Sequence, residues 1–228
     1  ARVRHSRSTA ERGILMLKAL LLTAVAASFS FAAEPAAGPD PDVALKVLLT
    51  GNRRFVAGRA THPHQTLARL RELSKGQHPS AVILSCADSR VAPELLFDQG
   101  LGDVFIVRVA GNILDDENLG SIEYAVEHLG TRLIVVLGHQ RCGAVSAAVQ
   151  GGKPAGHVGK LVEDIQPSVE ATKGKPGDAV ENAMRANVLR MVSLIADDET
   201  LGPVIKEGKV KVVGARYDLD NGRVELVK

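Results

Sequence analysis

The 228-residue chain contains no tryptophan, only two tyrosines and five phenylalanines. Proteins that bind single-stranded nucleic acids stack bases on aromatic side chains, so this class is disfavoured. The chain also lacks an excess of one charge, because its formal net charge is +2. Residues 1–32 hold five basic residues and one acidic residue, which leaves 23 basic against 25 acidic residues in the remainder. The sequence therefore indicates no basic nucleic-acid face.

Cysteine is almost as scarce, with Cys86 and Cys142 as the two examples. They are too far apart for a Cys-x-x-Cys pair, which excludes the redox chemistry of that motif. No glycine-rich fingerprint that cradles a phosphate follows a predicted strand, so a nucleotide-binding protein is disfavoured. What the chain does have is 45% hydrophobic residues, enough for a sizeable aliphatic core.

The N-terminal segment has the order of a secretory signal peptide. A basic region ends at Lys18, an apolar run covers residues 19–27, and small residues follow up to Ala32 and Ala33. We expect cleavage after one of these two alanines, so that residues 1–33 are a signal peptide and residues 34–228 form a single domain.

Met16 would start such a peptide at its ordinary length, and residues 1–15 would then be an overlong start. No Arg-Arg pair precedes the apolar run, which favours the general secretory (Sec) route over the twin-arginine route. We therefore expect an exported, periplasmic protein that has no membrane association after signal removal. A retained helical anchor is the alternative.

Short apolar runs alternate with amphipathic segments along the rest of the chain. Strands are expected at residues 81–84, 104–107 and 132–137, and a C-terminal hairpin is expected from 210–217 and 224–227 around Asp220-Asn221-Gly222. Helices are expected at residues 43–55 (with Asp42 as the cap), 66–73, 93–97, 143–149, 161–171 and 178–196, and from Asn118 or Ser121 to residue 129. This pattern predicts an α/β fold with a mainly parallel central sheet flanked by helices.

Reactive side chains directly follow two of the predicted strands. Cys86, Asp88 and Arg90 occupy alternate positions after residues 81–84, so in an extended chain they would leave on the same side. His139 and Cys142 follow residues 132–137. Because parallel sheets place their sites beyond the carboxyl ends of strands, we expect both loops to lie there.

The set Cys86, His139 and Cys142 predicts a metal site. Thiolates and an imidazole suit Zn²⁺, and three protein ligands leave a fourth position open, as in catalytic zinc sites. Three alternatives remain: a Cys86–Cys142 disulfide, which export would permit, a closed structural zinc site with Asp88 as permanent fourth ligand, and an inert pair of buried cysteines.

Asp88 and Arg90 can form a charge-assisted pair beside the metal. If Arg90 holds Asp88, the carboxylate can accept a proton from zinc-bound water. If the pair breaks, Asp88 can bind the metal as fourth ligand and close the site. The plainer alternative is a surface salt bridge worth about 0–1 kcal/mol. The sequence leaves the position of Asp88 open.

The motif Cys86-Ala-Asp88-Ser-Arg90, followed by His139-x-x-Cys142-Gly143, resembles the β-class carbonic anhydrases, and the likeness is close over about residues 76–150. The resemblance implies reversible hydration of CO2 to bicarbonate and a proton, by attack of zinc-bound hydroxide at one Zn²⁺ per chain. It assigns Asp88 and Arg90 to a catalytic dyad. It also implies a homodimer or a dimer of dimers, with active sites at the dimer interface.

The same resemblance implies a set of substrate-binding residues: Gln77, Phe105, Ala110, Tyr124 and the amide of Gly143. Ala110 departs from the family pattern, because the family members with a metal position open to water have a valine there. The width of the substrate cleft is therefore not settled by the sequence. Two alternative functions remain open: a hydrolase of carbonyl sulfide or carbon disulfide at the same zinc site, and a non-catalytic zinc-binding protein.

Overall fold

The computed structural model describes residues 37–152 and 154–228, which belong to one compact unit, Pro35–Lys228. The predicted signal peptide, residues 1–33, lies outside the described residues. Within the described part of the chain, no helix combines the length and apolar character needed to span a bilayer.

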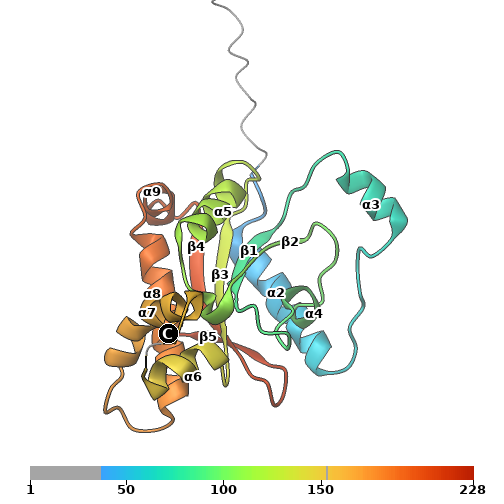
Figure 1. The fold of residues 1–228 in the computed structure, drawn as a ribbon. Coiled ribbons are helices and arrows are strands. Elements are labelled where there is room, and N and C mark those ends of the chain that lie inside the picture. Colours follow the sequence, from blue (N-terminus) through green and yellow to red (C-terminus); the bar gives the residue numbers. More distant parts are fainter. Residues whose placement is uncertain (1–36, 153) are drawn as a thin grey trace, which may run out of the picture. The chain divides into compact units, whose positions relative to one another are not determined.

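The centre of the fold is a five-stranded sheet with the strand order β2-β1-β3-β4-β5 (Figure 1). Strands β1 to β4 run parallel to one another, and β5 is antiparallel to β4. This confirms the predicted mainly parallel sheet and the C-terminal hairpin. The strands are β1 (Ala81–Ser85), β2 (Val104–Arg108), β3 (Leu133–His139), β4 (Lys211–Tyr217) and β5 (Val224–Val227).

Every residue of β1 and β3 is buried, because helices cover both faces of the sheet. Side chains alternate between the faces along each strand. On one face, Val82 and Leu84 pack into a core with α5 (Asp116–Glu127), α6 (Gly143–Gln150), α7 (His157–Glu170) and α8 (Ala179–Ala196). On the other face, Ala81 and Ile83 pack against α2 (Pro41–Val56) and α4 (Pro93–Leu96). Figure 1 shows these two layers on opposite sides of the strands.

Three helix boundaries differ from the sequence prediction. The cap of α2 is Asp40 rather than Asp42, because the Asp40 carboxylate accepts hydrogen bonds from the amides of Asp42 and Val43, and Pro41 can begin the helix without an N–H group. Helix α5 begins earlier than expected because Asp115 caps it. Helix α7 begins at His157 rather than near residue 161.

A short helix, α9 (Leu201–Lys206), was not predicted. Its six residues include Gly202 and Pro203, so no amphipathic repeat marks it. Helix α3 (Leu67–Leu73) begins after Thr66, whose hydroxyl caps it, in agreement with the prediction. A 3-10 turn, η1 (Ala110–Asn112), follows β2.

Candidate metal centre and active site

Cys86, His139 and Cys142 lie together at the carboxyl ends of β1 and β3. Cys86 directly follows β1, His139 is the last residue of β3, and Cys142 immediately precedes α6. These strands are adjacent and parallel, which brings their ends to the same edge of the sheet. The three potential ligand atoms lie within 4.8 Å of one another, and all three residues are buried. The two cysteines are free thiols with their Sγ atoms 4.0 Å apart, rather than a disulfide.

The His139 imidazole has one unsatisfied nitrogen that faces this cluster. Its Nδ1 lies 2.9 Å from the carbonyl oxygen of Gln140, which assigns the Nδ1–H tautomer. The other nitrogen, Nε2, is buried and has no hydrogen-bond partner among the described residues. A buried polar atom left unpaired costs about 1–3 kcal/mol. A metal ion between His139 and the two cysteines would satisfy it.

The charges of the thiols also fit a cation. Hydrogen bonds from the Cys142 thiol and from the amides of Gly111 and Asp88 lower the pKa of Cys86, although burial opposes them. The thiolate at Cys86 in turn raises the pKa of Cys142, because a second negative charge beside the first is unfavourable. Zn²⁺ prefers this set of two thiolates and one imidazole and would keep both thiols ionised. The residues present therefore fit a zinc ion.

The amide that hydrogen-bonds to Cys86 belongs to Gly111, which lies in η1 with φ +77°. The positive φ favours glycine, and a Cβ atom at this position would lie 2.6 Å from Cδ1 of Ile165, which would have to shift. The buried side chain of Asn187 in α8 donates to the Gly111 carbonyl at 2.9 Å. Sequence reasoning missed Gly111 and Asn187. The available signal was a polar residue on the otherwise apolar buried face of α8.

Asp88 and Arg90 form an ion pair beside the cluster. The Arg90 guanidinium donates from Nε to Oδ1 at 2.9 Å and from Nη2 to Oδ2 at 2.7 Å, and the Arg90 amide also donates to Oδ1 at 2.9 Å. These hydrogen bonds hold the pKa of Asp88 well below its usual range. The pair forms through an Asx-turn and not along an extended strand as expected, because β1 ends at Ser85.

The Asp88 carboxylate also faces the metal ligands. Its Oδ2 atom lies 3.8 Å from Nε2 of His139. Arg108 donates hydrogen bonds to the backbone carbonyls of Cys86 and Asp88 at 3.1 and 2.8 Å, which fixes the segment that carries both. The structure therefore places Asp88 on Arg90, within reach of the space between the three ligands.

Two of the residues assigned to the substrate cleft lie next to this cluster. Ala110 precedes Gly111, whose amide contacts Cys86. Gly143 follows Cys142 and is the exposed first residue of α6. Their positions are compatible with a cleft that begins at the metal ligands.

A single chain does not bring the other three substrate-cleft residues to the cluster of metal ligands. These residues are Gln77, Phe105 and Tyr124. Phe105 pairs with Val82, four residues before Cys86, which is about 13 Å along a strand. Tyr124 in α5 lies against Phe105, with ring centroids 6.3 Å apart. Gln77 is exposed and precedes the amino end of β1, the end opposite to the site.

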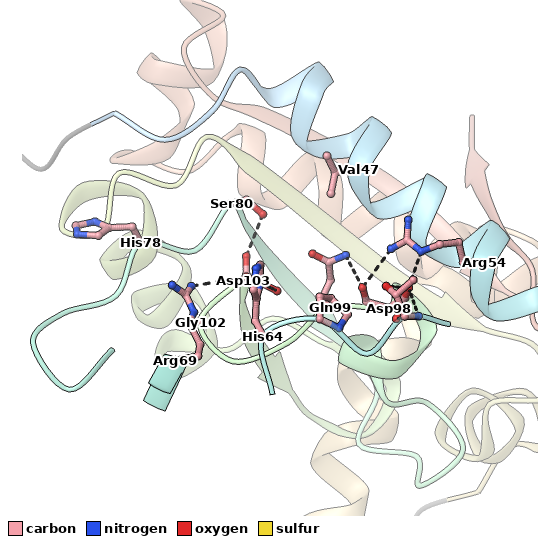
Figure 2. A pocket seen from close by; sticks show the side chains of 12 residues that line it. Val47, Arg54, His64, Arg69, His78, Ser80, Asp98, Gln99, Gly102 and Asp103 are labelled. Atoms are coloured by element: carbon pink, nitrogen blue, oxygen red, sulfur yellow. Dashed lines mark hydrogen bonds and ion pairs between the residues drawn. The ribbon is translucent and has the colours of Figure 1, made fainter. Parts of the chain in front are cut away.

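A pocket of about 470 Å³ lies among residues of α2, the segment after it and the segment between α4 and β2 (Figure 2). Arg54 donates to the buried Asp98 carboxylate at 2.6 Å, and the amides of Thr61 and His62 donate to the same group. Figure 2 shows a second convergence, of His64, Arg69 and Ser80 on Asp103. The carboxylates of this pocket are therefore paired, and they connect the segment after α2 to the segment between α4 and β2.

The fold and the site define a class: α/β proteins with a Cys-His-Cys metal-ligand set at the carboxyl ends of parallel strands. Residues 81–224 match the family model described as carbonic anhydrase. The chain is 46% identical over 192 residues to "Carbonic anhydrase 2" of Mycobacterium tuberculosis, covering 82% of this chain and 93% of the relative. It is 44% identical over 192 residues to a carbonic anhydrase of Mycolicibacterium smegmatis, with the same coverage.

Solved structures of β-carbonic anhydrases are also similar to this chain. A tetrameric β-carbonic anhydrase from Sordaria macrospora superposes with a TM-score of 0.65 at 25% identity, covering 80% of this chain and 96% of that one. A Coccomyxa β-carbonic anhydrase in complex with acetazolamide gives 0.64 at 27% identity, covering 80% and 86%. The chain belongs to the β-class carbonic anhydrases, which confirms the resemblance and the expectation of an enzyme of this family.

Proposed function

We propose that this protein catalyses the reversible hydration of CO2 to bicarbonate and a proton at one Zn²⁺ held by Cys86, His139 and Cys142. Membership of the family supports the reaction. The observation that supports the metal is the buried set of three ligand atoms within 4.8 Å, with Nε2 of His139 otherwise unsatisfied.

The proposed mechanism divides the work between the metal and the Asp88–Arg90 pair. Zinc supplies Lewis acidity, which makes water acidic enough to react as a nucleophile near neutral pH. Arg90 keeps Asp88 ionised and holds its carboxylate beside the metal ligands, paired with the guanidinium instead of bound as a fourth ligand. The free lone pair of Asp88 Oδ2 could then accept a hydrogen bond, and afterwards a proton, from a water molecule held between the carboxylate and the ligands.

A second copy of the chain is required if Gln77, Phe105 and Tyr124 line the cleft at the metal ligands. We propose that the site forms between two copies, as a homodimer or a dimer of dimers. Three observations support an interface along the β2 edge of the sheet. Tyr124 is 47% exposed, Leu67 and Leu70 of α3 are 70% and 53% exposed, and β2 is an edge strand. A related structure, from Sordaria macrospora, is described as tetrameric.

Mixed assemblies test this arrangement. Cys142→Ser removes the metal site of its own chain, and Gln77→Ala removes the glutamine that this chain would supply to the other copy. Each variant alone should be poorly active. After co-refolding, a heterodimer would contain one doubly defective site and one intact site, so activity should rise above the mean of the two variants. Activity that stays at this mean would contradict a shared site.

The substrate is tested by parallel stopped-flow assays with CO2 and carbonyl sulfide on the same zinc-loaded preparation. We expect fast CO2 hydration. Fast sulfide release with negligible CO2 hydration would favour the hydrolase of sulfur analogues. No turnover of either substrate by a zinc-loaded protein would favour a non-catalytic zinc-binding protein.

Export is also a proposal, which rests on the order of basic, apolar and small residues within residues 1–33. Cell fractionation combined with N-terminal sequencing tests it. The proposal predicts a periplasmic protein that begins near residue 33 or 34. An exported or membrane-bound protein that still carries Leu20 would contradict it.

A further inference from the structure

Gln140 lies between two of the proposed zinc ligands, and each of its polar groups has a partner. Its carbonyl accepts the hydrogen bond from Nδ1 of His139 at 2.9 Å. Its amide donates to the Tyr217 carbonyl at 3.0 Å. In its side chain, Oε1 accepts from the Leu219 amide at 3.2 Å and Nε2 donates to Asp220 at 3.2 Å. Gln140 thus connects the imidazole of His139 to the end of β4 and the turn that follows.

Arg141 adds a second connection to the same turn. Its guanidinium makes a bidentate ion pair with Asp220, at 2.9 Å from Nη1 and 2.7 Å from Nη2. Its backbone has φ +53°, a left-handed conformation that non-glycine residues adopt at a cost. This conformation lies within the turn between His139 and Cys142. The ion pair therefore holds a strained residue in place between two ligands.

The turn is itself fixed to the body of the protein. Asp218 accepts hydrogen bonds from the amides of Asp220 and Asn221. The nearly buried Arg216 donates to Asp218 at 3.0 Å and to Glu181 of α8 at 2.6 Å. Asp220 is thus presented to Gln140 and Arg141 by a rigid turn, although its own side chain is exposed.

We propose that Gln140 is a positioning residue for the metal ligand His139, and that the β4–β5 turn acts through Gln140 and Arg141 as a clamp. The clamp consists of Gln140, Arg141, Asp218 and Asp220. It fixes the Gln140 peptide, and the carbonyl of that peptide fixes the tautomer and the ring plane of His139. Without the clamp the Gln140 peptide is held only by its amide bond to the Tyr217 carbonyl, so its carbonyl can shift and the imidazole ring that it orients can tilt away from the metal. The inference rests on the proposed zinc site.

The variants are Gln140→Ala, Asp220→Ala and their combination. The chain offers a matched control on α7, where Gln166 donates to Glu170 in another amide–carboxylate hydrogen bond, of 3.1 Å. Gln166→Ala and Glu170→Ala remove this equivalent contact elsewhere in the fold. Asp220→Asn, which keeps the size of the side chain, is a milder variant in case Asp220→Ala does not fold.

The main readout is the zinc dissociation constant, measured by competition with a chromophoric chelator. Loss of a partner that orients a metal ligand typically costs about 10–100-fold in metal affinity. Gln140→Ala keeps the carbonyl that bonds His139 and removes only the side chain that anchors it, so we expect a loss at the lower end, about tenfold. We expect a smaller loss for Asp220→Ala, and less than the sum of both effects in the double variant, because the two side chains act in one network. The control variants should stay within about twofold of the parent protein.

Two further measurements separate positioning from folding. Urea unfolding of the metal-free proteins should be nearly the same for clamp and control variants. The absorption spectrum of the Co²⁺-substituted protein should change in its d–d bands for Gln140→Ala and remain unchanged for Gln166→Ala. Zinc affinities of both clamp variants within twofold of the parent, or affinity losses equal to the loss of metal-free stability, would overturn the proposal. Failure of the parent protein itself to bind zinc would instead contradict the proposed function.

Discussion

Two of the aspartate–arginine pairs, whose aspartates are ten residues apart in the sequence, differ in their surroundings. The Asp98–Arg54 pair is saturated, since Thr61 and His62 complete the hydrogen bonds of a carboxylate with 0% side-chain exposure. The Asp88–Arg90 pair is partly exposed and faces Nε2 of His139, which has no hydrogen-bond partner in the described part of the chain. Hydrogen bonds hold the pKa of both carboxyls below the usual range.

The surroundings of the two pairs separate a structural carboxylate from one that can take part in catalysis. A lowered carboxyl pKa is common to Asp88 and Asp98 and does not distinguish their roles. The neighbours distinguish them. Among the described residues, no unpaired buried group lies at the Asp98–Arg54 pair, whereas Asp88 keeps a lone pair of Oδ2 available next to two thiols and an imidazole. We therefore expect variants of Asp98 to change stability and variants of Asp88 to change activity.

Removal of the metal should give the largest effect. Chelation, or His139→Ala, should lower CO2 hydration by about a thousandfold or more, because water is no longer acidified near neutral pH. The melting temperature should also fall, because metal binding is coupled to folding. Stopped-flow assays and calorimetry before and after re-addition of zinc provide the measurement. Full hydration by the chelated protein would mean that the site is misassigned.

Asp88→Asn should give the next largest effect on activity. The amide cannot accept a proton, so turnover near neutral pH should fall by about 10²–10⁴-fold. Zinc content should stay the same, and the free energy of unfolding should change by less than about 1 kcal/mol because the pair is partly exposed. Hydration kinetics equal to those of the parent would remove Asp88 from the mechanism.

Asp98→Asn should have the opposite profile. The new amide group would face the amides of Thr61 and His62, and Arg54 would lose its partner. We expect a loss of about 2–4 kcal/mol in the free energy of unfolding, with the activity per folded molecule retained. Urea titrations measure the loss, and Asp164→Asn, at an exposed pair with Lys160, serves as the control. An equal loss in both variants would contradict the structural role of Asp98.

Acid sensitivity is expected to be the smallest of these effects. The folded-state pKa of Asp98 lies below the unfolded value of about 3.9, so its stabilisation is complete above that pH and is lost as the pH falls further. Metal-free Asp98→Asn should therefore lose less stability between about pH 5 and pH 3 than the metal-free parent protein. The variant should still lose some stability in acid, because the pKa of Asp218 is lowered as well. Identical slopes in urea titrations would refute this contribution.

The sequence was sufficient to predict the sheet and the three proposed ligands. Short apolar runs marked β1 and β3, and a parallel sheet places its site beyond the carboxyl ends of its strands, so Cys86 and His139 could be expected at the same edge. That β1 and β3 are neighbours is a finding of the structure. The hairpin was equally accessible, because Asn221-Gly222 is a strong local turn signal.

The rest depended on contacts that local patterns do not encode. Helix α9 lacks an amphipathic repeat, and the choice of Asp40 over Asp42 as cap is a matter of one hydrogen-bond geometry. The support of Cys86 by Gly111 joins residues distant in sequence. Gln77 and Tyr124 were assigned to the cleft by resemblance, and a single chain does not bring them there.

The most direct test of the central claim is the coordination of zinc in the purified protein, measured by metal analysis together with X-ray absorption at the zinc edge near neutral pH. We predict one zinc per chain with two sulfur ligands and one imidazole nitrogen, and loss of a sulfur ligand in Cys142→Ser. A protein without bound zinc, or a zinc shell without two sulfur ligands, would contradict it.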